Sequence, residues 1–407
     1  MITQGTPISP PFRIGQVSAT ISKVAGLICE CYPQARGLIV TGSAARNEET
    51  IAASDPITRW LSDLELLVVL DDSANIGIEA KTLDRLSMEA TRRLLADGVR
   101  VTVELTPAPE RYFASIHPHI FGYELRECGR QVFGAEDYLA RIPYFHWSEI
   151  PSEDAWRLVS NRMVEWLEYL LAPQEGSAAE QFYVLTKQYL DLVTSLSLFS
   201  GDYAPSYRTR AGAINAIASW MTESGVPVDP VRFAEAVSMA ADFKLDRSCR
   251  FGWLWGSSAP GLPAALQQQG LGWLYDFLPD TLASVWNWQA ARIAGLPPSV
   301  RSVEGQQLGR FYGLRDRLLG WGKLLLLSHG NTRRSAILRM PLLFAAGTPR
   351  SLIYECTARL LQSRDRATLR SVRRRLPTLS NRCSGTWEEL GRQCVLTWRT
   401  FLRRGNA

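Results

Sequence analysis

Two short apolar stretches near the start of the chain constrain its fold more than any other feature. Residues 37–41 read Gly-Leu-Ile-Val-Thr and are followed by Gly42 and Ser43, and residues 61–70 form a second stretch rich in apolar residues. A short apolar run that stops at a Gly-Ser pair is typical of a buried strand that turns into a helix. We therefore expect two buried strands, with a sharp turn directly after the first.

Two carboxylates, Asp63 and Glu65, interrupt the second stretch. Side chains alternate between the two faces of a strand, so both acids are expected on one face, opposite Leu64 and Leu66. Neighbouring carboxylates on a largely buried strand repel each other and lose hydration, which gives a purely structural protein little reason to keep them. A divalent cation removes this conflict, and Mg²⁺ prefers one or two carboxylates together with phosphate oxygens and water.

The Gly-Ser turn is suited to the phosphates that would accompany such a cation. Gly42 lets the backbone approach a phosphate closely, Ser43 adds a hydroxyl donor, and the amides at a helix start face an anion. Arg46 lies one turn further on, within reach of the same phosphates. A Gly-Ser turn is also an ordinary helix cap. The interpretation that this turn binds phosphate therefore depends on the acids that follow it, Asp63 and Glu65.

An apolar strand, a Gly-Ser turn and then Asp-x-Glu between apolar residues resemble the DNA polymerase β-like nucleotidyltransferase superfamily, over about the first third of the chain. The resemblance implies that Gly42 and Ser43 bind the nucleotide phosphates, and that acids on neighbouring strands hold two Mg²⁺ ions, for which Mn²⁺ substitutes. Two features depart from the family pattern: 19 residues separate Ser43 from Asp63, and the second acid is Glu65. We expect residues 47–56 to form an inserted loop that takes up the extra length, since lengthening a loop costs little entropy.

The resemblance also implies a third carboxylate and a phosphate-binding lysine. Residues 99–107 alternate as a strand does, and Glu104 is the only acid among them. Taken alone, Glu104 is equally an exposed charge on a polar strand face. In the family, an acid at this point completes the metal site and often acts as the base, so the resemblance assigns Asp63, Glu65 and Glu104 to metal binding and catalysis. Lys187 resembles a lysine of the family's helical domain that can contact the triphosphate; taken alone, a single lysine on a helix is more commonly an exposed charge.

The remaining pattern predicts an α/β domain followed by helices. Helical periodicity covers residues 15–32 and 76–97, and residues 124–134 read as a helix that runs into a Gly-terminated turn. From residue 152 onward the pattern is almost wholly helical. We therefore predict an α/β nucleotidyltransferase domain with a small mixed sheet and flanking helices over residues 1–145, a helical domain over 152–330 and a basic helical extension over 331–407.

Composition bears on the compartment and on the partners. The 407 residues include seven scattered cysteines and no apolar run of membrane-spanning length, and residues 1–11 lack the basic and apolar regions of a secretory signal. These features predict a cytoplasmic protein with reduced thiols and no membrane partner. Residues 332–407 carry 16 basic against 4 acidic residues, in a chain whose net charge is +5. The cluster from Arg364 to Arg375 is either a polyanion-binding face or a solvated helix surface; because no aromatic residues are interleaved with it, a nucleic-acid partner is not favoured.

The sequence thus predicts a Mg²⁺-dependent nucleotidyltransferase. It would move a nucleoside monophosphate from an NTP, with ATP as first choice, to a hydroxyl group and release pyrophosphate. A small hydroxylated molecule is the preferred acceptor, because no RNA-binding module is recognisable. Two alternatives stay open: a synthase of a nucleotide second messenger, in which a nucleotide is the acceptor, and a non-catalytic nucleotide-binding or regulatory protein that retains the fold. The complete acidic set argues against the last, since a decayed site is expected to lose its costly carboxylates first.

Overall fold

The structure is a computed structural model of the chain. It describes residues 10–54, 57–172, 176–246, 249–254, 261–297, 313–327, 344, 346–376 and 385–403. The chain divides into two compact units. The first unit comprises Met1–Pro151, Gly201–Gly212 and Met239–Gly256, and the second comprises Ser152–Ser200, Ala213–Ser238 and Ser257–Ala407.

A four-stranded mixed sheet forms the centre of the first unit. Its strands, in the spatial order β6-β4-β1-β7, are β6 (Val103–Pro109), β4 (Leu64–Leu70), β1 (Gly37–Val40) and β7 (Arg130–Gly134). β4 and β6 run parallel, whereas β1 runs antiparallel to both β4 and β7. The sheet confirms the predicted small mixed sheet.

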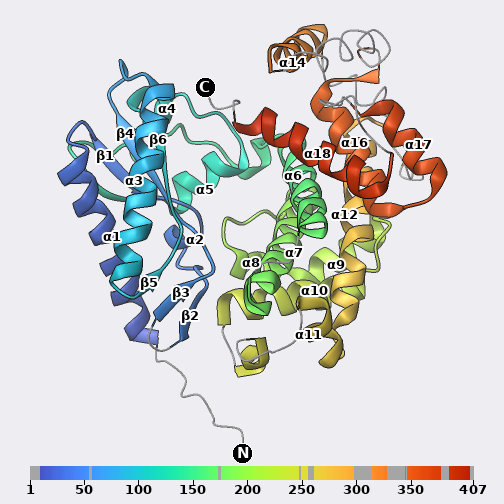
Figure 1. Cartoon of the computed structure of the whole chain (residues 1–407), viewed down its shortest axis with the longest axis horizontal. Helices are drawn as coiled ribbons and strands as arrows, with labels where there is room; N and C mark the ends of the chain where they lie inside the picture. Colours follow the sequence, from blue (N-terminus) through green and yellow to red (C-terminus); the bar gives the residue numbers. More distant parts are fainter. Residues whose placement is uncertain are drawn as a thin grey trace, which may run out of the picture. The chain divides into compact units, whose positions relative to one another are not determined.

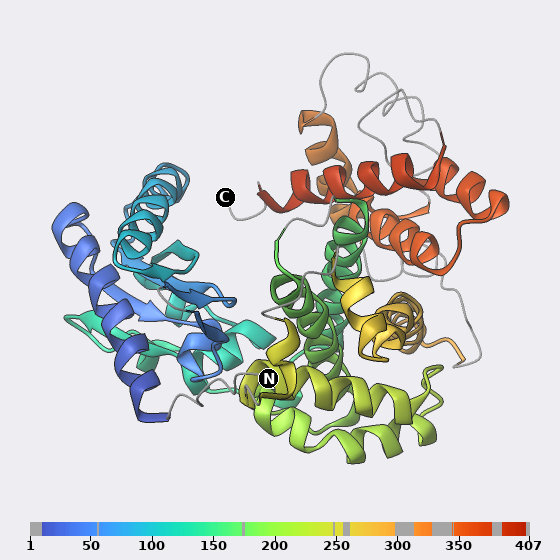
Figure 2. The same cartoon turned by 60° about the horizontal axis from the view of Figure 1, so that its bottom comes forward.

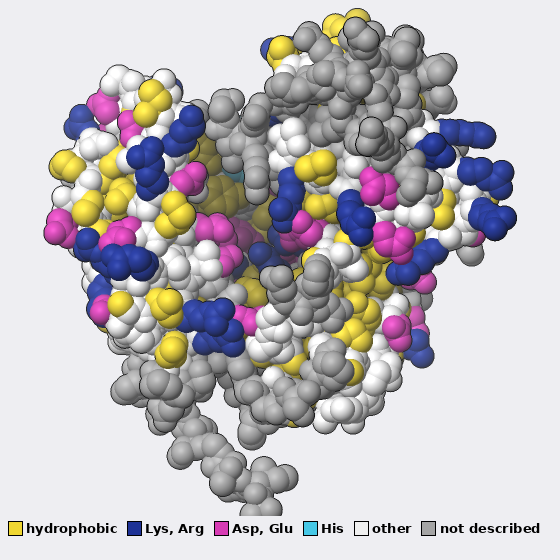
Figure 3. Space-filling model, in the orientation of Figure 1, with side chains coloured by type: hydrophobic (Ala, Val, Ile, Leu, Met, Phe, Trp, Pro, Cys, Tyr) yellow, Lys and Arg dark blue, Asp and Glu magenta, His cyan; other side chains and the backbone are white. Residues whose placement is uncertain are grey.

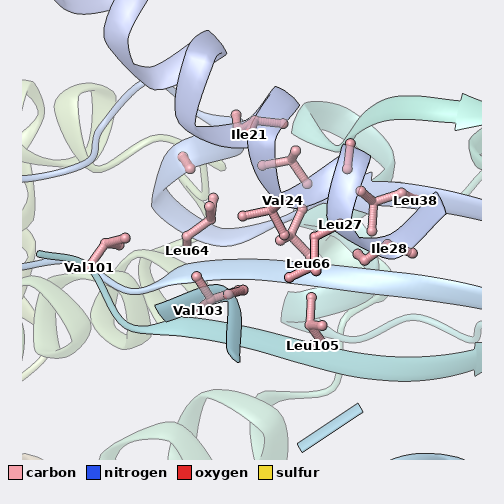
Figure 4. Packing of buried hydrophobic residues seen from close by; sticks show 14 of the residues in the cluster. Ile21, Val24, Leu27, Ile28, Leu38, Leu64, Leu66, Val101, Val103 and Leu105 are labelled. Atoms are coloured by element: carbon pink, nitrogen blue, oxygen red, sulfur yellow. The ribbon is translucent and has the colours of Figure 1, made fainter. Parts of the chain in front are cut away.

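Two long helices, α1 (Pro10–Cys31) and α3 (Ile76–Ala96), contribute apolar side chains to the core on one face of this sheet (Figures 1 and 2). Apolar residues of α1 recur every three or four positions, and Figure 4 shows them directed at side chains of the strands, among them Leu38, Leu64 and Leu66. These three side chains are at most 1% exposed. Burying a leucine fully stabilises a fold by about 1.5–3 kcal/mol. The burial of these leucines therefore determines which face of each strand points into the core.

Three segments of the first unit differ from the sequence-based prediction. Residues 47–56 are not simply a loop, because they contain β2 (Ile51–Ser54), which pairs antiparallel with β3 (Ile57–Trp60). The strand predicted over 99–107 is divided into β5 (Val99–Arg100), which pairs with β3, and β6 in the main sheet. The turn predicted near residue 134 is the strand β7, which follows α5 (Ile120–Cys128) and pairs with β1.

Short elements complete the first unit. They are α2 (Gly42–Ala45), α4 (Glu110–Ala114), α8 (Tyr207–Gly212), a π-helical turn (Asp242–Asp246) and three 3₁₀ turns (Leu139–Arg141, Trp147–Glu149 and Cys249–Leu254). Although α8 lies far along the chain, it belongs to the same compact unit as the sheet. The first unit is therefore not one continuous stretch of sequence.

The second unit is helical. Its helices are α6 (Ser152–Leu171), α7 (Ala178–Ser200), α9 (Ile214–Glu223), α10 (Pro230–Ala241, whose last residues belong to the first unit), α11 (Leu262–Gln268), α12 (Gly272–Ile293), α14 (Leu314–Leu327), α16 (Pro349–Gln362), α17 (Arg366–Arg375) and α18 (Trp387–Arg403). The apolar stripe of α6 is buried, as the periodicity of Val159, Met163 and Leu167 requires. α18 packs on α6 and α16 packs on α12, so these C-terminal helices share the core of the second unit. The predicted boundary near residue 330 lies outside the described residues.

Two further observations concern the thiols and the bilayer. The described cysteines Cys29, Cys31, Cys128, Cys356 and Cys394 form no disulfide bond with one another. Among the described helices, none combines the length and the apolar character needed to cross a bilayer.

Candidate functional site

The predicted acids and the Gly-Ser turn meet at one end of the main sheet. Because β4 and β6 are parallel, they start at the same edge, and because β1 is antiparallel to β4, it ends there. The register places Glu65 directly beside Glu104 on the neighbouring strand. The Thr41 N–H, just after β1, donates to the Glu65 carbonyl at 3.0 Å. Topology therefore brings together residues that are far apart in sequence.

Glu65 and Glu104 lie on the face of the sheet that α1 and α3 do not cover. Their neighbours Leu64, Leu66, Val103 and Leu105 are all buried in the core below α1 and α3. Alternation then directs Glu65 and Glu104 to the opposite face, where Glu65 is half-buried and Glu104 is exposed. The prediction that the two strands pair in one sheet and share an acidic face is confirmed.

Asp63 lies one residue before β4 rather than within it. The preceding Ser62 is buried and accepts a hydrogen bond from the Thr50 N–H at 2.7 Å, and the following Leu64 N–H donates to Thr102 at 2.8 Å. Asp63 itself is half-buried. These hydrogen bonds on either side of Asp63 hold it at the edge of the sheet where Glu65 and Glu104 also lie.

Gly42 is in contact with the carboxylate of Glu65. Its φ is +63°, in the left-handed region that side chains disfavour, and a Cβ atom there would collide with the Glu65 carboxylate. The backbone conformation therefore favours glycine, and any larger residue would also have to displace the Glu65 side chain. The half-buried Ser43 follows directly, in the four-residue helix α2. The predicted helix is present but only four residues long. Its backbone amides, and not the dipole of a long helix, would therefore bind an anion.

Whether this edge of the sheet can bind a metal ion depends on which side chains supply ligand atoms there. In the described part of the chain, no three His, Cys, Asp or Glu side chains form a ready-made metal cage. Asp63, Glu65 and Glu104 nevertheless begin two adjacent strands, and Glu65 and Glu104 are in register. Mg²⁺ takes only one or two protein carboxylates when phosphate oxygens and water supply the rest. The carboxylates therefore fit a cation that binds together with a nucleotide.

Arg46, predicted to contact the phosphates, is held by partners within the fold. Its side chain is only 6% exposed; the Nε donates to Glu48 Oε2 at 3.0 Å and an Nη donates to Glu124 Oε2 at 2.7 Å. The guanidinium also lies 5.0 Å from the ring centroid of Tyr207. These contacts satisfy Arg46 within the fold, because two carboxylates already balance its charge. A phosphate contact by Arg46 would require this network to open.

The network continues to a second buried arginine, which sequence reasoning missed. Arg210 in α8 is 2% exposed and donates to Glu124 Oε1 at 2.9 Å and to the Ala204 carbonyl at 2.7 Å. Tyr203 donates its hydroxyl to the same Glu124 oxygen at 2.7 Å. We call the set Arg46, Glu48, Glu124 and Arg210 the buried charge network. Its two cations and two anions compensate each other.

Glu48 joins α8 to the segment that follows the Gly-Ser turn. Its carboxylate accepts hydrogen bonds from the Ser206 hydroxyl at 2.7 Å and from the Tyr207 and Arg208 amides at 3.1 and 2.9 Å. Burial alone would raise the pKa of Glu48, but these donors and the Arg46 guanidinium hold its pKa below the usual value. For Arg46, burial acts to lower the pKa, and the carboxylates of Glu124 and Glu48 more than reverse that effect, so its pKa is raised. Both groups are therefore charged at neutral pH.

Arg130 and Lys187 complete the set of candidate residues. Arg130, at the start of β7, donates a hydrogen bond to the Ala44 carbonyl in α2. The sequence analysis did not single out Arg130, because no local pattern predicts that β7 pairs with β1. Lys187 lies half-buried in α7 of the second unit. Its predicted contact with a triphosphate stays a prediction.

Comparison with known proteins adds no relative. No protein-family model, no curated protein and no solved structure matches this chain.

Proposed function

We propose that the first unit is a nucleotidyltransferase, which transfers a nucleoside monophosphate from an NTP to a hydroxyl group and releases pyrophosphate. The observation that carries the proposal is the in-register pair Glu65 and Glu104, with the backbone of Gly42 against the Glu65 carboxylate. Metal-assisted phosphoryl transfer needs backbone donors that hold the phosphates and carboxylates that hold the metal ions. A Gly-Ser turn and carboxylates at the same edge of the sheet could supply both. The resemblance of the first third of the chain to the polymerase β-like nucleotidyltransferases supports the same reaction.

Each residue has a distinct role in this proposal. The amides and hydroxyl at Ser43 donate hydrogen bonds to phosphate oxygens and so orient the triphosphate. Asp63, Glu65 and Glu104 would hold Mg²⁺, or Mn²⁺ in its place, and the bound ions would neutralise phosphate charge and lower the pKa of the acceptor hydroxyl. Glu104 would accept the proton of the incoming hydroxyl, and its exposure is compatible with that role. The buried charge network holds the loop after the turn in place.

The acceptor we propose is a small hydroxylated molecule. Glu104 is exposed, so a small acceptor can reach its carboxylate. A nucleotide acceptor, which would make the protein a second-messenger synthase, is the second candidate and uses the same residues. In both cases NTP binding depends on the carboxylates and on the turn.

The test combines binding and turnover. The purified chain is mixed with each of the four labelled NTPs, Mg²⁺ or Mn²⁺, and in turn a panel of polyols, amino sugars and nucleotides, while pyrophosphate release is measured. We expect metal-dependent release with at least one NTP and acceptor, and none from Glu65→Gln. Metal-dependent NTP binding without any release would favour the non-catalytic alternative. An absence of NTP binding with either metal would contradict the proposal.

A further inference from the structure

The helix α17 carries a row of exposed arginines. Arg366, Arg370, Arg373 and Arg374 are all exposed, and Figure 3 shows basic side chains gathered over this helix. Positions i, i+4, i+7 and i+8 lie on one face of a helix, so the four guanidinium groups project from one side along about 12 Å. We call these four residues the arginine face.

The opposite side of α17 anchors the helix to its neighbours. Val372 is fully buried, and the helix packs against α16 and α18. Asp365 caps the helix start, because its side chain accepts hydrogen bonds from the Ala367 and Thr368 amides at 2.7 and 2.8 Å. The arginine face is therefore presented by a helix that is capped and packed, so binding a partner requires no folding of the helix.

Two described acids beside this helix, Glu355 and Asp365, make contacts away from the arginine face. Glu355 of α16 is buried and pairs with Arg359 at 3.0 Å and with Arg375 at 2.8 Å, on the packed side. Asp365 is engaged at the cap, where hydrogen bonds from Ser363 and from Thr368 lower its pKa to about 2. The four guanidinium groups of the arginine face lie on the exposed side of α17, where a ligand in solution can reach them.

We propose that the arginine face binds the phosphate backbone of a nucleic acid. Planar guanidinium groups donate two hydrogen bonds to one phosphate, which makes arginine the preferred residue for this ligand. An anionic membrane would also attract the charge, but a helix at a membrane surface needs exposed apolar side chains to insert. Leu369 is half-buried and Val372 is buried, so α17 presents no large apolar side chain outward. The sequence shows the cluster of arginines but not which of them are exposed on one face, and on the sequence alone a nucleic-acid partner is not favoured; the structure leads us to the opposite inference. The inference does not depend on the proposed enzymatic function.

The experiment measures binding of the whole chain to a short single-stranded RNA, to duplexes of the same sequence in RNA and DNA, and to phosphatidylserine vesicles. Fluorescence anisotropy is recorded from about 50 to 200 mM salt, the range in which phosphate contacts are screened. The variant is Arg366→Gln with Arg370→Gln. We expect at least tenfold weaker nucleic-acid binding and a salt dependence shallower by roughly one to two in log-log slope.

A matched control removes two exposed arginines elsewhere. Arg92→Gln with Arg232→Gln changes side chains that are 70% and 62% exposed, so the same net charge is lost away from α17. A second pair, Arg373→Gln with Arg374→Gln, should weaken binding in the same direction as the first. Equal losses in the control and the α17 variants, binding to vesicles alone, or no binding to any nucleic acid would overturn the proposal.

Discussion

The first unit contains two groups of charged residues, and they differ in how far they are exposed. In the buried charge network, Arg46 and Arg210 face Glu48 and Glu124, and every side chain of the four is at most 16% exposed. At the strand edge, Asp63, Glu65 and Glu104 are three carboxylates that are half-buried or exposed. The buried set is paired within the fold, whereas the carboxylates at the strand edge are partly or fully accessible, as a ligand site requires.

This difference separates structural from functional charge. Removing one member of a balanced buried network leaves an uncompensated charge, which costs several kcal/mol. Removing one carboxylate from the half-buried or exposed strand edge is instead expected to change stability little while ligand binding is lost. The following predictions test that contrast, from the largest expected effect to the smallest.

Glu65→Gln is expected to have the largest effect, and only on activity. The change removes a metal-ligand charge but keeps the shape that packs against Gly42, so turnover should fall by at least about a thousandfold, or about 4 kcal/mol. Thermal denaturation should show an unchanged or slightly higher melting temperature. Retained turnover in this variant would remove Glu65 from the site.

Arg210→Met should act in the opposite way. It leaves Glu124 buried beside Arg46 alone, and we expect a loss of about 3–5 kcal/mol in the free energy of unfolding, measured by urea denaturation. Arg208→Met is the matched control, because the Arg208 side chain is exposed and only its backbone amide contacts Glu48. The control should change stability by less than about 0.5 kcal/mol. Similar losses in both variants would show that the charge network is not what stabilises α8.

Gly42→Ala probes the contact between the turn and the acid edge. The added methyl group would collide with the Glu65 carboxylate and would be held at a φ of +63°. We expect a loss of about 1–3 kcal/mol in stability together with weaker NTP binding. Gly26→Ala, in α1, meets nothing within 4 Å and should instead stabilise by about 0.5–1 kcal/mol. A stable Gly42→Ala protein with full NTP affinity would contradict the described geometry.

Ser43→Ala should have the smallest effect, on ligand binding. Loss of one hydrogen bond from a hydroxyl to a charged phosphate oxygen is worth about 1–2 kcal/mol in affinity. Isothermal calorimetry with an NTP and Mg²⁺ measures this directly, and unfolding of the free protein should be unaffected. If the NTP affinity does not change, the Ser43 hydroxyl makes no contact with the phosphates.

The sequence allowed prediction of features that are set by local pattern. Alternation placed Glu65 opposite its leucine neighbours, and the Gly-Ser pair marked the turn, because both depend on residues close in sequence. The same reasoning did not foresee the buried partners of Arg46, since Glu124 lies 78 positions away in α5. It also missed Arg210 and the strand β7, whose pairing is decided by tertiary contacts. Long-range charge pairing has no local periodicity, so only the structure reveals which charges are balanced.

The most direct test of the contrast is binding of Mn²⁺ in the presence of a non-hydrolysable NTP analogue, followed by electron paramagnetic resonance. The wild type, Glu65→Gln, Glu104→Gln and Glu48→Gln are compared, each checked to be folded by circular dichroism. We expect Mn²⁺ affinity to fall at least tenfold in Glu65→Gln and Glu104→Gln and to persist in folded Glu48→Gln. Unchanged Mn²⁺ binding in the first two variants, or a loss confined to Glu48→Gln, would contradict the assignment of the strand edge as the site.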